Sequence, residues 1–354
     1  MKSFDQAYLG KLVVPQRIIT MIRKLGEHKG RQDLYKKQAP EMLENLRQVA
    51  LIQSTESSNR IEGIVADDKR LRAIVEEKAK PANRPEAEIA GYRDVLNTIH
   101  QSHEHIPFTE RVVLQLHRDL MKYAGVDGGR WKSAPNEISE TLPDGTKHIR
   151  FTPVAPHLTD EAMRSVHTRF NELEEAHEWD PLLLIPFYVL DFLCIHPFLD
   201  GNGRLARLIA LLLLYQHGYE VGRYVSLERI IEQTKQSYYD TLYTSSQGWH
   251  ESRHDVLPWT EYFLSTLLAA YDEFENRFGK VSKGRGSKTD TVKNAIDRFV
   301  RDFSLTDIEK ACPLVSRDMI RRVLFDLKKE GLVVCLGRGP SARWRKSVKP
   351  PKRV

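Results

Sequence analysis

The sequence predicts a predominantly helical body that carries one short β-hairpin and is followed by a small, basic module. Three observations lead to this prediction. Apolar residues recur at helical spacing in almost every long segment, one turn signal interrupts that pattern near residue 144, and a glycine-rich basic stretch divides the chain after residue 278. With 41% apolar and 9% aromatic residues among 354, the chain has enough apolar side chains for a substantial core.

Helical periodicity marks the elements of the body. The first clear helix covers residues 40–55, where one face carries Leu43, Leu46, Val49 and Ile52. The segment 109–123 repeats the pattern behind Thr109, a residue type that caps helix N-termini. Further helices are expected at residues 86–100, 159–177, 181–195, 205–215, 230–245 and 258–278.

The stretch from Arg130 to Pro156 breaks the helical pattern. Pro143, Asp144 and Gly145 form a turn signal between the segments 138–141 and 148–151. This arrangement predicts two short antiparallel strands.

A second unit is expected beyond the polar, glycine-rich linker at residues 279–288. A helix at 289–302, a second opened by Ser304, and a third opened by Ser316 and closed by Gly331 come first. Two strands, at 332–336 and 342–345, then flank a turn at 337–341. This order of elements is the plan of a winged helix.

Charge is distributed unevenly between the two units. From Lys280 to Val354 there are 20 Lys and Arg against 8 Asp and Glu, whereas the rest of the chain has 34 against 40. The module therefore favours DNA or another acidic surface as its partner, with a solvated charged face or a protein-docking unit as the alternatives. The side chains expected to meet DNA are Arg317, Arg321 and Lys328 on the third helix, and Arg338, Arg343 and Arg345 on the wing.

Composition narrows the class of protein. No apolar N-terminal run suggests a signal peptide, and the longest apolar stretch, 208–214, is far too short to span a bilayer. Cys194, Cys312 and Cys335 lack metal-ligand spacing and are typical of thiols in a reducing compartment. We therefore expect a cytoplasmic protein with no membrane partner.

The segment with the most chemistry is His-Pro-Phe-Leu-Asp-Gly-Asn-Gly-Arg-Leu-Ala-Arg at residues 196–207. Pro197 disfavours a helix at His196, and the two glycines allow positive φ angles and close approach of a ligand to the backbone. A glycine-rich turn that leads into a helix is an anion site, because free N–H groups converge there and the helix dipole adds positive charge.

The side chains of this segment extend the argument. Arg204 and Arg207 lie three residues apart on one helical face and suit phosphate oxygens. Asp200 would repel phosphates unless a divalent cation lies between them, which predicts Mg²⁺. Phe198 is expected to pin the loop to the core, and His196 is the only base in the segment at neutral pH. These parts fit phosphoryl or nucleotidyl transfer.

The segment resembles the signature of the Fic (Fic/DOC) family, His-x-Phe-x-Asp/Glu-Gly-Asn-Gly-Arg-x-x-Arg, at every fixed position. The resemblance covers roughly residues 109–262 and reaches back to about residue 40. It implies an all-α Fic-type core with a β-hairpin flap, and a protein adenylyltransferase that moves AMP from ATP to a Ser, Thr or Tyr hydroxyl. The target protein would dock along the flap at about residues 130–156.

The resemblance also implies the roles of individual residues. His196 would deprotonate the target hydroxyl, Asp200 would bind Mg²⁺, and Asn202 with the glycine amides would hold the α-phosphate region. Arg204 and Arg207 would take the β- and γ-phosphates. By the same analogy Tyr238 and Tyr239 line the base pocket. The nucleotide site as a whole would comprise these two tyrosines and the loop residues Phe198, Leu199, Asp200, Gly201, Asn202, Gly203, Arg204, Leu205 and Arg207.

An earlier segment, Ser58-Asn-Arg-Ile-Glu62-Gly63, is similar to the family's inhibitory motif, Ser/Thr-x-x-x-Glu-Gly/Asn. Glu62 would then pair with Arg207, occupy the γ-phosphate position and block productive ATP binding. The resulting domain plan has five parts: an N-terminal region with the inhibitory helix (1–108), the catalytic core (109–278), the linker (279–288), the winged-helix-like module (289–346) and a basic tail (347–354).

Alternative functions are kept beside this one. A Fic-type site can move another group or remove AMP, and the body can serve as a ligand sensor for a DNA-binding regulator. A cysteine nucleophile is excluded, because Cys194 lies in an apolar helix without a base at helical spacing. A second copy of the chain is also kept as a partner.

Overall fold

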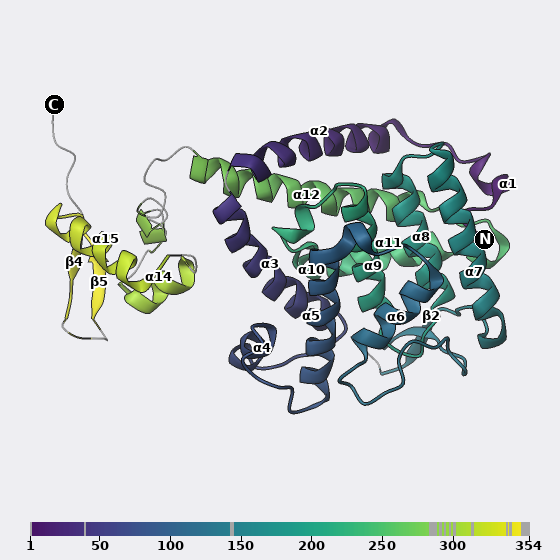
Figure 1. Ribbon diagram of the computed structural model, residues 1–354, viewed down its shortest axis with the longest axis horizontal. Helices are drawn as coiled ribbons and strands as arrows, with labels where there is room; N and C mark the ends of the chain where they lie inside the picture. Colours follow the sequence, from purple (N-terminus) through teal and green to yellow (C-terminus); the bar gives the residue numbers. More distant parts are fainter. Residues whose placement is uncertain are drawn as a thin grey trace. The chain divides into compact units, whose positions relative to one another are not determined.

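The computed structural model describes residues 2–38, 40–141, 145–282, 289, 292–293, 295–296, 299, 302–312, 315–337, 339 and 342–347. It divides into two compact units, 1–274 and 275–354, which are described separately (Figure 1). Several predicted features lie outside the described residues: Pro143, Asp144, Arg338, the linker residues 283–288 and the tail residues 348–354.

Two apolar helices form the centre of the first unit. Helix α8 (Pro181–Ile195) packs against α9 (Asn202–Gln216), and nearly every side chain of both is buried. A helix that is apolar on all sides is stable in water only when other elements cover it. Asp180 accepts a hydrogen bond from the N–H of Leu182 and caps α8, with Pro181 at its first position. The loop that joins these two helices is therefore fixed at both ends.

Other helices surround this pair (Figure 1). The long helix α2 runs along α12, where Gln32 accepts a 3.0 Å hydrogen bond from the Tyr271 hydroxyl. The helices of this shell are α1 (Gln6–Leu9), α2 (Gln16–Gln38), α3 (Pro40–Ile61), α4 (Asp68–Val75), α5 (Arg84–Ser102), α6 (Glu110–Leu120), α7 (Pro156–Ala176), α10 (Leu227–Gln233), α11 (Lys235–Ser246) and α12 (Leu257–Ser282).

The helical class predicted for the body is confirmed, with differences at the element ends. Helix α3 continues six residues past the predicted end at residue 55, since its last turns are buried and not amphipathic. The predicted helix 230–245 is two helices, which meet at Thr234. Helix α12 continues to Ser282, so the first four residues of the predicted linker are helical. Helix α2 was not predicted.

The β-hairpin lies between α6 and α7, as predicted. Strand β1 (Ile138–Thr141) pairs antiparallel with β2 (Lys147–Phe151), and a register shift between Ile138 and Ser139 marks a bulge. Gly145 takes a positive φ of 82° in the connection, which agrees with the predicted turn.

The second unit has its own apolar core. Ser304 and Asp307 form a capping box at the start of α14 (Leu305–Ala311), and Ser316 caps α15 (Arg317–Lys329). A three-stranded antiparallel sheet has the order β3 (Phe303–Ser304), β5 (Arg343–Lys346), β4 (Val333–Cys335). The strand β3 was not predicted, because two residues give no periodicity. The core of the second unit includes Val292, Ile296, Ile308, Ile320, Leu324 and Trp344.

The surface of this module carries both charge and apolar side chains. Arg317, Arg321 and Lys328 of α15 are exposed as predicted, and so is Phe325. Arg345 is held by two hydrogen bonds to Asp302, at 2.6 and 2.7 Å. Binding of DNA or of a protein by this module stays a prediction. Within the described part of the chain, no helix combines the length and apolar character that crossing a bilayer needs.

Candidate active site

The loop of residues 196–201 connects the two central helices. His196 ends α8 with φ 50° and ψ 61°, and its N–H still donates to the Phe192 carbonyl at 2.8 Å. Pro197 explains why the helix stops there, as predicted. Gly201 (φ 80°) begins α9, and a Cβ on it would lie 2.4 Å from Met121 Cε. No side chain caps α9, so its first N–H groups remain available to an anion.

The loop is closed on itself by one amide side chain. Asn202 accepts from the Phe198 N–H at 2.9 Å and donates to the Phe198 carbonyl at 2.7 Å. Phe198 is fully buried and stacks on His117, with ring centroids 3.6 Å apart. Phe198 therefore anchors the loop, as predicted, and does not line the cleft. The Asn202 side chain therefore holds the shape of the loop at the edge of the cleft.

Two residues that precede the hairpin hold the loop from outside, and sequence reasoning missed both. The Lys132 ammonium donates to the Ile195 carbonyl at 3.0 Å and to Asn136 at 2.8 Å. Asn136 in turn donates to the carbonyls of His196 (3.1 Å) and Phe198 (2.9 Å). Burial lowers the pKa of Lys132 to about 8. The base of the hairpin is thus hydrogen-bonded to the loop of residues 196–201.

Removal of the hydrogen bonds from Asn136 to the loop is expected to lower activity without unfolding the protein. In Asn136→Ala, two loop carbonyls lose their donor, and each lost hydrogen bond costs about 1 kcal/mol. We expect kcat/KM for transfer to fall about tenfold and the free energy of unfolding to fall by about 2 kcal/mol. Steady-state kinetics and urea titration measure these two quantities. Unchanged kinetics in the folded variant would contradict the positioning role.

His196 is set up to act as a neutral base. Its Nδ1 lies 3.2 Å from the Leu193 carbonyl, so the proton on Nδ1 is shared with that oxygen and Nε2 keeps its lone pair. Burial lowers the pKa of His196 to about 4, although the Leu193 carbonyl opposes this effect. Above pH 5 the imidazole is therefore uncharged and able to accept a proton.

Histidine NMR checks this directly. We expect the His196 resonance to show no titration between pH 7.5 and 5.5, because the folded pKa lies well below the ordinary value of about 6.5. The neutral form is present above that pKa and is lost only as the pH falls toward 4. A His196→Gln variant assigns the resonance among the 13 histidines. A midpoint near 6.5 would show that the ring is solvated.

A cleft of about 540 Å³ opens beside this loop. The hairpin contributes Ile138, Ser139 and Arg150 to one side, and α11 contributes Tyr238 and Tyr239. The predicted residues that line the cleft are Glu62, His196, Leu199, Asp200, Gly201, Asn202, Gly203, Arg204, Tyr238 and Tyr239. Phe198, Leu205 and Arg207, which were also predicted for the nucleotide site, do not line it, because all three side chains are buried.

The two predicted aromatic residues lie at the inner wall of the cleft. Their rings meet edge to face, with centroids 5.2 Å apart. Burial raises the pKa of Tyr238 to about 12 and also raises that of Tyr239, so both stay uncharged. Neutral aromatic rings beside an anion site suit the stacking of a nucleobase.

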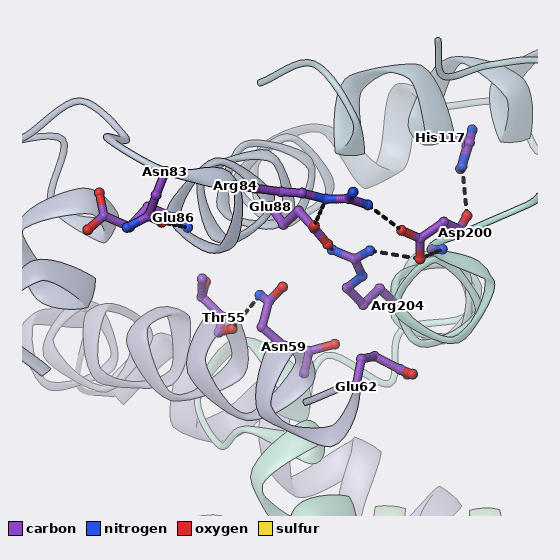
Figure 2. Close-up of polar contacts among 12 residues, drawn as sticks. Thr55, Asn59, Glu62, Asn83, Arg84, Glu86, Glu88, His117, Asp200 and Arg204 are labelled. Atoms are coloured by element: carbon purple, nitrogen blue, oxygen red, sulfur yellow. Dashed lines mark hydrogen bonds and ion pairs between the residues drawn. The ribbon is translucent and has the colours of Figure 1, made fainter. Parts of the chain in front are cut away.

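Asp200 and Arg204 belong to a group of charged side chains (Figure 2). Arg204 is 1% exposed and pairs with Glu88 at 2.7 Å and with Asp200 at 3.4 Å. Arg84 also approaches Asp200, at 3.3 Å. Arg204 was predicted to face phosphates, but these acids already satisfy part of its charge. Glu88 and Arg84 could not be predicted from the sequence, since both precede the loop by more than 100 residues.

His117 fixes the carbonyl of Asp200 (Figure 2). The Gly129 N–H donates to Nδ1 of His117 at 2.9 Å, so the ring proton lies on Nε2, which donates to the Asp200 carbonyl at 3.1 Å. Burial lowers the pKa of His117 to about 4, so the ring is neutral. This residue was also missed, because one histidine in an amphipathic helix carries no distinctive pattern.

Arg207 meets the predicted inhibitory motif at the end of α3. Its Nη2 lies 2.8 Å from a Glu62 carboxylate oxygen and 2.8 Å from the Ser58 carbonyl, while Nε donates to the Ser58 hydroxyl at 2.9 Å. Gly63 has φ 79° and turns the chain directly after the glutamate. The remaining Nη1 is buried and has no hydrogen-bond partner among the described residues.

The Glu62 carboxylate lies directly over the start of α9. A Cβ on Gly203 would be 2.3 Å from Glu62 Oε1 and 3.4 Å from Arg207 Nη1. The carboxylate therefore occupies the space above the uncapped helix N-terminus, where an anion is favoured. Lys235 holds the end of α3 by donating to the Ile61 carbonyl at 2.7 Å.

The residues present also fit one bound Mg²⁺. Asp200 is 53% exposed and lines the cleft, and a carboxylate next to phosphate oxygens is the usual protein ligand of this ion. Among the described residues, no group of three or more His, Cys, Asp or Glu could form a protein-only metal site. Any metal here would thus need the substrate for most of its ligands.

Comparison with known proteins identifies relatives of this chain. The Fic/DOC family model matches residues 107–214. "Protein adenylyltransferase fic-1" of Caenorhabditis elegans is 27% identical over 180 residues, 51% of this chain and 31% of that protein. "Protein adenylyltransferase Fic" of Nematostella vectensis is 27% identical over 238 residues, 64% of this chain and 49% of that protein. The chain thus spans only about a third to a half of these relatives.

Solved structures resemble the fold. A Fic family protein from Desulfovibrio desulfuricans G20 has a TM-score of 0.61 at 21% identity, over 96% of this chain and 99% of that one. The Fic-1 structure from C. elegans has a TM-score of 0.57 at 23% identity, over 73% and 71% of the two chains. At these identities the likeness establishes the fold alone.

Proposed function

We propose that this chain, a Fic family protein whose residues 107–214 match the Fic/DOC family model, is an autoinhibited protein adenylyltransferase. Its substrates are ATP and a Ser, Thr or Tyr hydroxyl of a target protein. The observation that carries the proposal is a neutral His196 beside an uncapped helix N-terminus, in a cleft that also holds the half-exposed carboxylate of Asp200 and two tyrosines.

The transfer step follows from these positions. His196 Nε2 accepts the proton of the target hydroxyl while that oxygen forms a bond to the α-phosphorus of ATP. The bond from the α-phosphorus to the bridging oxygen breaks, and pyrophosphate leaves with the electron pair. The N–H groups at the start of α9 and the Arg207 guanidinium stabilise the negative charge that develops. When bound at Asp200, Mg²⁺ supplies further neutralisation of the phosphates.

The flap is proposed as the docking site for the target. It lines the cleft with Ile138 and Ser139, and Asn136 links its base to the His196 carbonyl. An extended target segment that pairs with the hairpin would carry its hydroxyl past the imidazole.

Inhibition is proposed to arise from the contact between Glu62 and Arg207. Since the carboxylate lies over Gly203 and uses Nη2 of the arginine, it takes the place of a terminal phosphate. Desolvation opposes the charge of Arg207, but the nearby Glu62 leaves its pKa raised, so the guanidinium stays charged. A triphosphate must displace this carboxylate to reach the arginine.

Labelled nucleotides test the reaction. The protein is incubated with Mg²⁺ and ATP that carries the label on either the α- or the γ-phosphate, as wild type and as Glu62→Gly. Adenylylation predicts incorporation from the α-label only, and more of it in the variant. Incorporation from the γ-label would instead indicate phosphorylation, and incorporation from neither label, with self-modification and a cell lysate as acceptors, would overturn the proposal.

A further inference from the structure

A closed ring of four charged side chains lies between α5 and the start of α9 (Figure 2). Arg84 Nε contacts Glu88 Oε1 at 2.9 Å, Glu88 Oε2 contacts Arg204 at 2.7 Å, Arg204 contacts Asp200 Oδ1 at 3.4 Å, and Asp200 Oδ2 returns to Arg84 at 3.3 Å. Charges alternate in sign around this ring, so each one has two opposite neighbours.

The ring has a buried half and an exposed half. Glu88 and Arg204 have side chains that are 7% and 1% exposed, and they make the shortest contact of the ring. Arg84 and Asp200 are 61% and 53% exposed, and both contacts to Asp200 are longer. Ion pairs between exposed groups contribute little free energy, whereas a buried charge without its partner is very costly. The exposed half can therefore exchange partners while the buried half stays in place.

From this difference we infer that Glu88 is a positioning residue of the active site. It fixes the Arg204 guanidinium beside the anion loop, while Asp200 stays free to leave Arg84 for a metal ion. This inference rests on the proposed function, because it assigns a further residue to the same site. Arg204 is then a side chain that Glu88 holds in place for the nucleotide, and not an arginine that is free until the nucleotide binds.

The position of Glu88 in the chain supports this role. It lies in the second turn of α5, a helix outside the family signature, and both of its oxygens are used by arginines. Arg204 is among the largest fully buried side chains, so its charge needs a nearby acid. Asp200 alone is a poor candidate for that acid, because a bound metal ion would compete for the same carboxylate.

Helix α5 offers a matched control two residues away on the same element. Glu86 is 5% exposed and pairs with Arg70 at 2.6 Å, much as Glu88 pairs with Arg204. Its carboxylate accepts from Arg70 and from the Ala82 N–H, which both lie outside the loop of residues 196–201. Its backbone N–H donates to Asn83, the N-cap of the helix (Figure 2). The two glutamates therefore share burial, helix and type of partner, and differ in whether that partner lies in the site.

The test compares Glu88→Gln with Glu86→Gln in the Glu62→Gly background, where transfer is uninhibited. Loss of a partner that orients a ligand-binding side chain typically costs about 10–100-fold. We expect kcat/KM of Glu88→Gln to fall by that factor, and the affinity for a non-hydrolysable ATP analogue with Mg²⁺, measured by calorimetry, to fall with it. Glu86→Gln should stay within about threefold of the background, although the urea midpoints of both variants fall.

A double variant separates positioning from a general structural effect. If Glu88 acts through Arg204, then Glu88→Gln added to Arg204→Gln should lower kcat/KM by no more than about threefold further. Should Glu88→Gln fail to fold, Glu88→Asp keeps the charge one methylene farther away and should show a smaller loss of nucleotide affinity.

Two outcomes would overturn the inference: a Glu88→Gln enzyme as active as Glu86→Gln, or losses that multiply in the double variant. If the Glu62→Gly background itself transfers nothing, the proposed function fails instead, and the calorimetric arm still tests Glu88.

Discussion

Replacement of His196 by alanine is expected to lower the rate of AMP transfer by about 10³-fold. A positioned general base typically contributes 10²- to 10⁴-fold, and among the residues that line the described cleft no other histidine is present to take its place. The measurement is incorporation of α-labelled ATP by Glu62→Gly with and without the second substitution His196→Ala.

The control separates loss of the base from loss of the loop. His196 makes one side-chain hydrogen bond, to the Leu193 carbonyl, so its removal should leave the affinity for Mg²⁺ and nucleotide within about threefold. His105→Ala serves as the matched variant, because that histidine is exposed and lies outside the cleft. If His196→Ala transfers AMP as fast as His105→Ala, then His196 is not the base.

Replacement of Glu62 by glycine is expected to raise AMP transfer by about 10- to 100-fold. The carboxylate makes one charge-assisted hydrogen bond to Arg207, and such bonds contribute about 1.5–3 kcal/mol, which equals this factor in an equilibrium. Without it, Nη2 is released to a phosphate and the space over Gly203 opens. Quantitative labelling at limiting ATP measures the change.

Glu56→Gln provides the comparison for Glu62→Gly. Glu56 lies on the same helix and pairs with Arg60, which also contacts Glu232 of α10, and Glu56 does not line the cleft. Its replacement should leave labelling at the wild-type level. Equal labelling by wild type and Glu62→Gly would show that the contact with Arg207 does not limit the reaction.

The sequence predicted the elements whose causes are local. Proline and glycine set the ends of α8 and the hairpin turn, and Thr109 and Ser316 cap their helices as expected. The chemistry of residues 196–207 could also be predicted, because the histidine, the aspartate, the glycines and the arginines are close together in the chain. The contact between Glu62 and Arg207 was found only through the resemblance.

What the sequence did not reveal depends on contacts across long separations. Asn136, Lys132, His117 and Glu88 hold the loop, and each comes from an element distant from it in the chain. None of these four residues belongs to a recognisable sequence motif, since an asparagine in a loop or a glutamate in a helix is common. The loop-closing role of Asn202 was missed for the same reason: its hydrogen-bond partners are backbone atoms of a loop whose closure the sequence does not display.

The close approach between Gly203 and the glutamate of α3 restricts how regulation can vary. A methyl group at position 203 would lie 2.3 Å from Glu62 Oε1, so a side chain there requires the carboxylate to move. Under the proposed function, such a substitution would disturb the resting contact and would also narrow the space proposed for a phosphate. A substitution of Glu62 on α3 would instead act on the proposed inhibition alone and leave the loop of residues 196–201 unchanged.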